Sequence, residues 1–338
     1  MTADDGDGDV DVGVIGVGAM GRNHARVYAE LSGAHLVGIA DADAERASEV
    51  AGEIGTTSHA TGTLLDRADA VSIAVPTEYH ADLAGECIDA GVHVLVEKPF
   101  VASLSEGRDL IERAEAADVL LQVGHIERFN PAVTELTRIV EGVSPISVDA
   151  RRLGPPSDDA RSLDENVVHD LMIHDLDIVR SLVSGEIARI NALRTDDGQH
   201  ANAQLRFDDG TIATLTASRV TQQKVRDLTI TAEECYIELD YLTQTIEIHR
   251  QSRPEYMEIG GNIRYHHEGI TERPMVQSGE PLRYELESFV ESVAEHAAPR
   301  ITGEDGLRAV ELAGAVLERA KATEESRTDA PRVVRSDR

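Results

Sequence analysis

Short apolar runs alternate with helical patterns over the first third of the chain, and this alternation limits the fold more than any other feature. Strands are predicted at residues 10–15, 35–40, 70–75, 92–96 and 119–123, which are rich in Val, Ile and Leu. Helices are predicted between them at residues 20–31, 44–54, 79–90 and 103–117. Such an alternation predicts a doubly wound parallel sheet with helices on both faces.

The pattern changes after about residue 145. Two apolar runs, 203–207 and 211–215, flank Asp208-Asp209-Gly210, which is a hairpin signal. Further strands at 228–230 and 236–239 and closing helices at 282–296 and 304–322 complete the pattern. We therefore expect an α/β protein with a Rossmann domain over residues 10–125 and an α+β domain over 126–322, whose sheet is mainly antiparallel. Disordered tails are expected at 1–9 and 323–338.

The charge balance excludes some classes of partner. The chain has 62 acidic and 32 basic residues and a formal net charge of -30, which argues against nucleic-acid backbones and anionic membranes. Only three basic residues are lysines, and there is no Trp. So many carboxylates repel one another unless salt screens them, and the Debye length is about 3 Å at 1 M salt. The composition therefore predicts a halophilic protein.

Compartment and cysteine chemistry follow from equally simple observations. The start, residues 1–9, lacks the basic and apolar stretches of a signal peptide, and no apolar run approaches the roughly 20 residues that span a bilayer. Cys87 and Cys235 are the two cysteines and are far apart, so neither a zinc site nor a disulfide scaffold is indicated. A cytoplasmic protein is expected.

Gly16-Val17-Gly18-Ala19-Met20-Gly21 fits the dinucleotide-binding fingerprint. The first glycine makes the turn, the second lets the backbone approach a pyrophosphate, and the third lets helix pack on strand. The motif follows a predicted strand and opens a predicted helix, which is the context it requires. Residues Gly16, Gly18, Ala19, Met20 and Gly21 are therefore candidate cofactor contacts.

Further cofactor contacts are predicted where the second and third strands end. A carboxylate at Asp41 accepts hydrogen bonds from a ribose 2′-hydroxyl, and no arginine follows until Arg46, so NAD is favoured over NADP. The alternative for Asp41 is a helix N-cap. Pro76 and Thr77 end the third strand on the same edge and are expected to line the cofactor, and His80 is either a further contact or a plain helix-start residue.

Lys98 stands in Glu97-Lys98-Pro99, directly after a buried strand, in a chain with only two other lysines, Lys224 and Lys321. An ammonium is a compact charge that can give up a proton, which a guanidinium does not do. Lys98 is therefore a candidate active-site residue, and Glu97 beside it a candidate cofactor contact. The alternative is a surface lysine in a loop.

The glycine motif running into Arg22-Asn23-His24, with Glu97-Lys98-Pro99 downstream, resembles the Gfo/Idh/MocA oxidoreductase family over about residues 10–322. The resemblance implies a Rossmann domain followed by an open-faced antiparallel sheet, with the substrate held between them. It also implies a homodimer or homotetramer formed through the open sheet face, which we expect to be apolar.

The family's third motif is an Asp followed four residues later by a His, and Asp170 and His174 match it. Helical spacing of four puts both side chains on one face, so the carboxylate can orient the imidazole. The segment also reads as a metal cluster. However, His169 and His174 are five apart and point to different faces of an α-helix, and hydride transfer needs no metal, so none is expected.

The string 123–131, Val-Gly-His-Ile-Glu-Arg-Phe-Asn-Pro, resembles a clade that oxidises the 3-hydroxyl of UDP-N-acetylglucosamine. This implies that His125, Arg128, Phe129 and Asn130 lie near the substrate; the alternative is a domain-connecting turn. Arg151 and Arg152 end a predicted strand, where they either hold a diphosphate, with Arg152 as the candidate, or form salt bridges.

The expected function is therefore NAD-dependent oxidation of a sugar hydroxyl, first of all C3 of UDP-N-acetylglucosamine. Lys98 would hydrogen-bond the substrate oxygen and His174 would take its proton, although the sequence leaves open which of the two is the proximal base. The alternatives are an inositol, free-sugar or sugar-phosphate dehydrogenase of the same family, and a non-catalytic dinucleotide-binding regulator.

Overall fold

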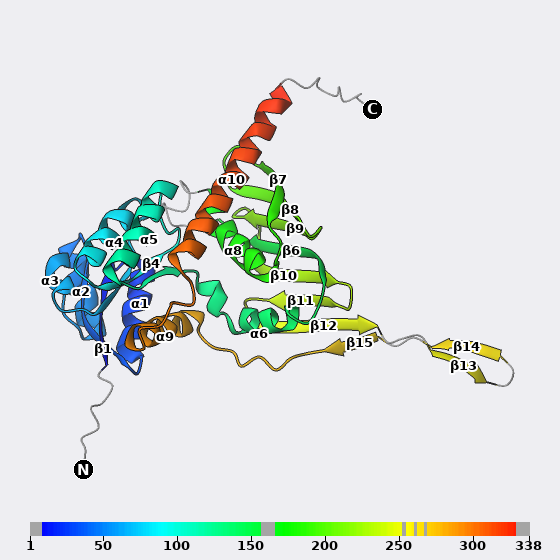
Figure 1. Ribbon diagram of the computed structural model, residues 1–338, viewed down its shortest axis with the longest axis horizontal. Helices are drawn as coiled ribbons and strands as arrows, with labels where there is room; N and C mark the ends of the chain where they lie inside the picture. The colour runs from blue at the N-terminus through cyan, green and yellow to red at the C-terminus, as the bar shows by residue number, and fades with distance from the viewer. Residues whose placement is uncertain (1–8, 157–165, 252–254, 260–261, 267–268, 329–338) are drawn as a thin grey trace, which may run out of the picture. The chain divides into compact units, whose positions relative to one another are not determined.

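The computed structural model describes residues 9–156, 166–251, 255–259, 262–266 and 269–328 (Figure 1). These residues fall into two compact units, one within 1–130 and 279–311 and the other within 131–278 and 312–338. The expected tails lie mostly outside the described residues, and the last helix extends to residue 328. No helix in the described part of the chain is both long and apolar enough to cross a bilayer.

The first unit is built on a five-stranded parallel sheet, as the alternating pattern predicts. Its strands are β1 (Val10–Ile15), β2 (Ala34–Ala40), β3 (Ala70–Ile73), β4 (His93–Glu97) and β5 (Leu121–Gly124). Its helices are α1 (Ala19–Glu30), α2 (Ala44–Ile54), α3 (Thr61–Leu65), α4 (His80–Asp89), α5 (Leu104–Ala117) and α9 (Pro281–Ala294), with 3₁₀ turns η1 (Thr77–Tyr79) and η2 (Ile126–Phe129). The strand order β2-β1-β3-β4-β5 reverses direction at β1, and a ligand crevice forms at the carboxyl ends of strands at such a point.

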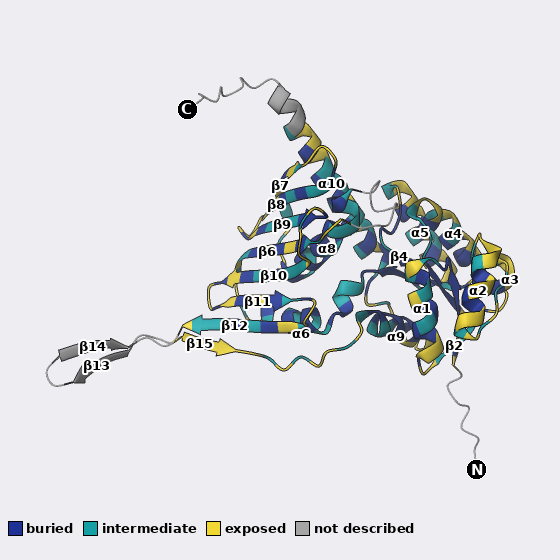
Figure 2. Ribbon diagram, turned by 180° about the vertical axis from the view of Figure 1, so that it is seen from behind, coloured by how far each residue is buried: buried dark blue, intermediate teal, exposed yellow. Residues whose placement is uncertain are grey.

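Both faces of this sheet are buried, which explains why its strands are apolar runs and not alternating ones. On one face Leu95 packs with Tyr28 of α1 and Phe289 of α9. On the other face Val96 packs with Leu110 of α5. Figure 2 shows the strands in dark blue and the outer sides of α2, α4 and α5 in yellow. The layers position the carboxyl ends of β1 to β4 along one edge.

Helix α5 begins with the capping box that the spacing of Ser103 and Glu106 indicates. The Ser103 side chain accepts from the Glu106 N–H, and the Glu106 carboxylate accepts from the Ser103 N–H. The two bonds satisfy helix-end donors that have no partner inside the helix. The start of α5 fixes where the loop that carries Lys98 ends.

Helix α9 belongs to the first unit, although the sequence pattern places it in the second domain. Leu282, Leu286 and Phe289 recur on one helix face and are buried in the core that contains Tyr28. The domain boundaries expected from the sequence therefore differ from the compact units, because the chain returns to the first unit after completing the second sheet. A linear reading of strand and helix patterns does not reveal such a return.

Within the residues that the structure describes, the second unit contains an eight-stranded sheet, a two-stranded hairpin and three helices. The strands of the large sheet are β6 (Pro145–Leu153), β7 (Ile187–Arg194), β8 (His200–Phe207), β9 (Ile212–Ser218), β10 (Val225–Ala232), β11 (Tyr236–Asp240), β12 (Thr245–Gln251) and β15 (Gly269–Glu272). The hairpin pairs β13 (Glu255–Ile259) with β14 (Asn262–His266). The helices are α6 (Pro131–Val140), α8 (Ile173–Leu182), preceded by the π-helical turn η3 (Val168–Met172), and the part of α10 (Gly303–Thr328) that follows residue 311.

The large sheet has the order β15-β12-β11-β10-β6-β9-β8-β7, and all neighbours are antiparallel except β6 and β9. The hairpin predicted at Asp208-Asp209-Gly210 joins β8 to β9, with Gly210 at a φ of +96° that suits glycine. One face of the sheet packs on helices through residues such as Leu136, Leu176 and Val316. Figure 2 shows β15 at the edge in yellow, exposed along its length.

Candidate active site

The turn after β1 gives each glycine of the fingerprint a separate role. Gly16 has a φ of +87°, and a Cβ there would lie 2.7 Å from the carbonyl oxygen of Ala74. A Cβ on Gly21 would lie 1.8 Å from the carbonyl oxygen of Gly16, so this position must be glycine for the helix to pack. A Cβ on Gly18 would meet no atom within 4 Å. Backbone at Gly18 therefore borders open space, as the fingerprint requires for the approach of a pyrophosphate.

Helix α1 begins at Ala19, directly after this turn. Gly18 occupies the N-cap position, and no side chain caps the helix. The first N–H groups of a helix, here those of Ala19 and Met20 among others, have no partner within the helix, and the helix dipole favours an anion beside them. The fingerprint residues predicted to contact the cofactor thus lie together in one turn at the start of α1, and their contact with a pyrophosphate stays a prediction.

Asp41 directly follows β2, and its carboxylate reaches back to the glycine turn. It accepts hydrogen bonds from the N–H of Val17 at 2.8 Å and of Asp43 at 2.9 Å, and from the Arg46 guanidinium at 3.0 Å. Burial alone would raise the pKa of Asp41, but the two backbone bonds and Arg46 together lower it. Asp43, and not Asp41, caps helix α2, so the N-cap alternative for Asp41 is wrong.

Pro76 and Thr77 follow β3 at the same edge of the sheet and are partly buried. Close by, His80 is 1 % exposed and joins two loops, a role that the sequence does not show. Its Nε2 lies 2.9 Å from the carbonyl oxygen of Val75, and its Nδ1 lies 2.9 Å from that of Pro99. His80 is thus more than a helix-start residue, because it connects the ends of β3 and β4.

Lys98 follows β4 and is partly buried, and the peptide bond to Pro99 is cis. Glu97 before it is buried, with Oε1 2.9 Å from Nε2 of His24 and Oε2 accepting from the Lys98 N–H at 3.1 Å. Burial raises the pKa of Glu97, but His24 and then the Lys98 charge outweigh it and hold the pKa below its usual value. Both carboxylate oxygens of Glu97 therefore have partners within the protein, and its contact with the cofactor stays a prediction.

A second acid, Glu285 of α9, lies in the same core and was not anticipated from the sequence. It is fully buried, and neither carboxylate oxygen has a hydrogen-bond partner among the described residues. Burial first, and then the charge of Glu97, raise the pKa of Glu285 well above its usual range. Two carboxyl groups near the loop of Lys98 thus have opposite character, since the pKa of Glu97 is lowered and the pKa of Glu285 is raised.

The four residues predicted near the substrate from the string at 123–131, namely His125, Arg128, Phe129 and Asn130, lie in and around η2 of the first unit. The Arg300 guanidinium stacks over the Phe129 ring at 4.8 Å and donates to the Arg128 carbonyl oxygen at 2.8 Å. The Arg128 guanidinium lies 3.8 Å from Asp305. His125 and Asn130 are buried. The turn is thus fixed by the chain around residue 300, and its contact with substrate stays a prediction.

In the second unit, Asp170 lies in η3 and His174 in the first turn of α8. Asp170 thus lies in a π-helical turn, which has more residues per turn than the α-helix expected from the sequence, and the shared face of Asp170 and His174 stays a prediction. Asp170 forms an ion pair with Arg219, which follows β9 and is buried. Burial lowers the pKa of His169, which favours the neutral imidazole. Orientation of His174 by Asp170 remains a prediction.

The two arginines of β6 have different environments. Arg151 is exposed and pairs with Asp227 on the open face of the sheet at 2.9 Å. Arg152 is 2 % exposed and donates two hydrogen bonds, of 3.0 and 2.8 Å, to the equally buried Asp175 of α8, and its guanidinium lies 5.2 Å from the centre of the Tyr241 ring. The sequence left open whether these arginines bind a diphosphate or form salt bridges. Both form salt bridges in this structure, and a diphosphate contact of Arg152 stays a prediction.

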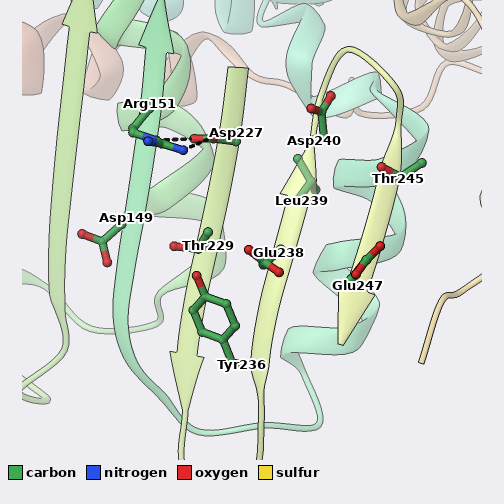
Figure 3. Close-up of a pocket in the computed structure, with 10 residues that line it drawn as sticks. All are labelled: Asp149, Arg151, Asp227, Thr229, Tyr236, Glu238, Leu239, Asp240, Thr245 and Glu247. Atoms are coloured by element: carbon green, nitrogen blue, oxygen red, sulfur yellow. Dashed lines mark hydrogen bonds and ion pairs between the residues drawn. The ribbon is translucent and has the colours of Figure 1, made fainter. Parts of the chain in front are cut away.

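The open face of the second sheet carries a pocket of about 570 Å³ across β6, β10, β11 and β12 (Figure 3). It is lined by Asp149, Arg151, Asp227, Thr229, Tyr236, Glu238, Leu239, Asp240, Thr245 and Glu247. Glu238 and Glu247 face each other on neighbouring strands, and together with His249 they form a group, within the described residues, whose ligand atoms lie within 4.8 Å of one another. His249 also hydrogen-bonds Glu238 at 2.9 Å, and the expectation of no metal stays a prediction. Around this pocket the face is polar, so the expectation of an apolar open face is wrong there.

Two family models match the chain. The oxidoreductase family model with an NAD-binding Rossmann fold matches residues 10–125, and the GFO/IDH/MocA C-terminal domain model matches residues 144–238. The first unit is therefore an NAD-binding Rossmann domain, which confirms the predicted fold class and cofactor.

Comparison with individual proteins agrees with the models. The chain is 36% identical over 306 residues to UDP-N-acetylglucosamine 3-dehydrogenase of Acidithiobacillus ferrooxidans, which covers 89% of this chain and 94% of that protein. A solved structure of the Acidithiobacillus ferrooxidans enzyme matches with a TM-score of 0.84 at 34% identity, over 93% of this chain and 98% of the other. The inositol 2-dehydrogenase of Rhizobium meliloti is 26% identical over 331 residues, 91% of this chain and 96% of that protein.

Proposed function

Because this chain belongs to the GFO/IDH/MocA oxidoreductase family, we propose that it oxidises the C3 hydroxyl of UDP-N-acetylglucosamine with NAD. The observation that carries the proposal is the similarity to a UDP-N-acetylglucosamine 3-dehydrogenase along nearly the whole of both chains. Lys98, Asp170 and His174, which the proposed chemistry requires, are all present. Members of the family differ in substrate, so the sugar is the part that most needs a test.

Bound NAD supplies the acceptor for the hydride that leaves C3. Lys98 donates a hydrogen bond to the C3 oxygen and stabilises the negative charge that develops there. His174 takes the hydroxyl proton, because an imidazole exchanges protons near neutral pH. Asp170, which forms an ion pair with Arg219, orients the imidazole of His174.

Substrate and cofactor contacts extend this assignment. Gly18, Ala19 and Met20 hold the pyrophosphate of NAD with backbone N–H groups, and Asp41 accepts from the adenosine ribose. Pro76, Thr77 and Glu97 border the cofactor on the Lys98 side. The sugar is lined by His125, Arg128, Phe129 and Asn130. Arg152 contacts the diphosphate when its buried ion pair with Asp175 opens.

NADH production at 340 nm tests the function, with NAD in 2 M KCl and UDP-N-acetylglucosamine, myo-inositol, glucose or glucose 6-phosphate as substrate. We expect turnover with UDP-N-acetylglucosamine, seen most clearly with a coupled aminotransferase that removes the 3-keto product. Lys98→Met should lower kcat by at least about 100-fold and leave the Kd for NAD within about twofold. Lys224→Met, at an exposed lysine of the second unit, is the matched control and should leave kcat unchanged. Loss of NAD binding in Lys98→Met, or turnover of inositol alone, would overturn the assignment.

An inositol dehydrogenase is the second candidate, since a relative with that activity matches over 91% of this chain. Turnover of myo-inositol in the same assay, with none of the nucleotide sugar, distinguishes it. A non-catalytic regulator would bind NAD and reduce none of it with any of these substrates.

We also propose a habitat from the net charge and an assembly from the family resemblance. A net charge of -30 favours a folded state that needs molar salt, so the melting temperature should rise steeply between 0.1 and 2 M KCl. A cytoplasmic homodimer or homotetramer is proposed from the family resemblance. Light scattering in 2 M KCl measures the assembly, and a monomer at assay concentration would contradict it.

A further inference from the structure

The backbone of Lys98 is held firmly on its amino side. Its N–H donates to Oε2 of Glu97 at 3.1 Å, and Oε1 of Glu97 lies 2.9 Å from Nε2 of His24. His24 is fully buried and Glu97 is 7 % exposed, so water does not compete for these bonds. This chain of contacts fixes where the strand ends and the Lys98 loop begins.

His80 holds the other side of the loop. Its Nδ1 lies 2.9 Å from the Pro99 carbonyl oxygen and 3.2 Å from that of Phe100, and its Nε2 lies 2.9 Å from the Val75 carbonyl oxygen. Carbonyl oxygens only accept, so each contact is a hydrogen bond when that ring nitrogen carries a proton. Each neutral tautomer therefore donates to one side, and the ring holds both sides by exchange between its two tautomers or as an imidazolium.

The two sides that His80 joins are the ends of neighbouring parallel strands. Val75 precedes Pro76 and Thr77, which we place beside the cofactor, and Pro99 follows Lys98. At 1 % exposure the imidazole is sealed from solvent, and its bonds are the kind that fix geometry, because buried carbonyls left without a donor are costly.

We propose that His80 is a positioning residue, which fixes Lys98 through the Pro99 carbonyl and the cofactor loop through the Val75 carbonyl. Its part in turnover rests on the proposed function. Its effects on NAD binding and on the environment of Lys98 do not need a substrate.

Asparagine and glutamine variants separate the two bonds. The side-chain amide of Asn reaches about as far as Nδ1 of His, and that of Gln about as far as Nε2. His80→Asn therefore keeps a donor for Pro99, His80→Gln keeps one for Val75, and His80→Leu keeps neither. His93→Asn is the matched control, since His93 starts the same strand β4 at its far end and accepts from the Leu120 N–H at 2.9 Å.

The expected pattern is a split between kcat and cofactor affinity. His80→Gln should lower kcat at least tenfold and leave the Kd for NAD within twofold, because the Lys98 loop loses its bond. His80→Asn should keep kcat within threefold of wild type and weaken NAD binding at least fivefold. His80→Leu should show both losses, and His93→Asn neither.

A spectroscopic reading reports on Lys98 directly. Reductive ¹³C-methylation labels the amino terminus and all lysines, of which the chain has three, and Lys98→Arg assigns the Lys98 signal. That signal should move in His80→Gln and His80→Leu and stay in place in His80→Asn.

Three results would overturn the proposal. One is wild-type kcat, Kd and Lys98 signal in His80→Leu. Another is a loss of kcat and NAD affinity in equal measure in the Asn and Gln variants, tracking the fall in melting temperature, which would make His80 a packing residue. The third is the reverse pattern, in which His80→Gln weakens NAD binding and keeps kcat while His80→Asn lowers kcat and keeps NAD binding. If His80→Leu does not fold, the Asn and Gln pair still decides. Should wild type reduce NAD with none of the substrates, the proposed function fails, and the NAD and NMR readings still test His80.

Discussion

Removal of Asp175 should unfold the second unit at a much lower temperature than wild type. The Arg152 guanidinium and the Asp175 carboxylate are 3 % and 2 % exposed and are joined by two hydrogen bonds. Asp175→Ala takes away the carboxylate and leaves a buried positive charge that no longer receives this compensation. Breaking a buried pair by removing one partner destabilises proteins by about 3–5 kcal/mol. For a domain of 150–250 residues this corresponds to a fall in Tm of about 6–20 °C.

The assay is thermal unfolding followed by near-ultraviolet circular dichroism in 2 M KCl, where screening weakens exposed pairs far more than buried ones. Asp227→Ala is the matched control, because it breaks the exposed pair with Arg151, the neighbour of Arg152 on β6. We expect it to change the free energy of unfolding by less than about 1 kcal/mol. The double variant Arg152→Met/Asp175→Leu should recover most of the lost stability, since an apolar pair avoids the desolvation of both charges.

Two outcomes would refute this reasoning. If Asp175→Ala and Asp227→Ala lower Tm equally, burial of the pair has no energetic consequence. If Arg152→Met keeps Tm but loses affinity for the nucleotide sugar, Arg152 is a diphosphate ligand and the buried ion pair is not its main role.

Three further predictions concern single groups of the first unit. Burial raises the pKa of Cys87 to about 12, so at pH 8 only about one thiol in 10,000 is ionised and a disulfide reagent should label Cys87 only after unfolding, as peptide mass spectrometry can show; labelling of the native protein within minutes would contradict this. Asp41→Ala should lower kcat/KM for NAD by about 10–100-fold and reduce the preference for NAD over NADP, because Arg46 loses its hydrogen bond to a carboxylate and keeps only Asp43 at 3.8 Å; unchanged cofactor kinetics would remove Asp41 from the site. The pKa of Glu285 is raised in the folded protein. The free energy of unfolding that protonation of this carboxyl contributes is therefore fully present below its ordinary, unfolded-state pKa, and it is lost as the pH rises through the folded-state pKa. Glu285→Gln should therefore match wild type near pH 4 and exceed it at pH 8 in urea unfolding, and equal curves at both pH values would count against burial of a neutral acid.

The cofactor half of the candidate site was predictable because it depends on local sequence. Strand ends, the glycine turn at Gly16 and the capping box at Ser103 are set by residues within a few positions of one another. The edge where Asp41 and Lys98 lie follows from the alternation of strands and helices, since parallel strands bring their carboxyl ends together.

Contacts between distant residues were not predictable, because a sequence shows a charge and not its partner. Arg151 and Arg152 are neighbours in the sequence, and nothing in it shows that Arg152 pairs with a buried Asp175 whereas Arg151 pairs with Asp227 at the surface. His80 gives no signal either, since a histidine at a helix start commonly has no tertiary role. The return of α9 to the first unit depends on which of two apolar cores accepts its buried face, and both cores are chemically alike.

The acid-rich composition makes this limit most visible. In a chain with 62 acidic residues, a carboxylate after a strand is weak grounds for a ribose contact, since a helix cap explains it equally well. In the structure Asp43 caps α2, whereas Asp41, two residues earlier, accepts from the N–H of Val17 in the glycine turn, and its contact with a ribose stays a prediction. The two buried acids differ for the same reason: hydrogen bonds and charge from His24 and Lys98 lower the pKa of Glu97, whereas Glu285, with no hydrogen-bond partner among the described residues, has a raised pKa. The partner that faces a carboxylate thus decides its chemistry, and only the fold determines that partner.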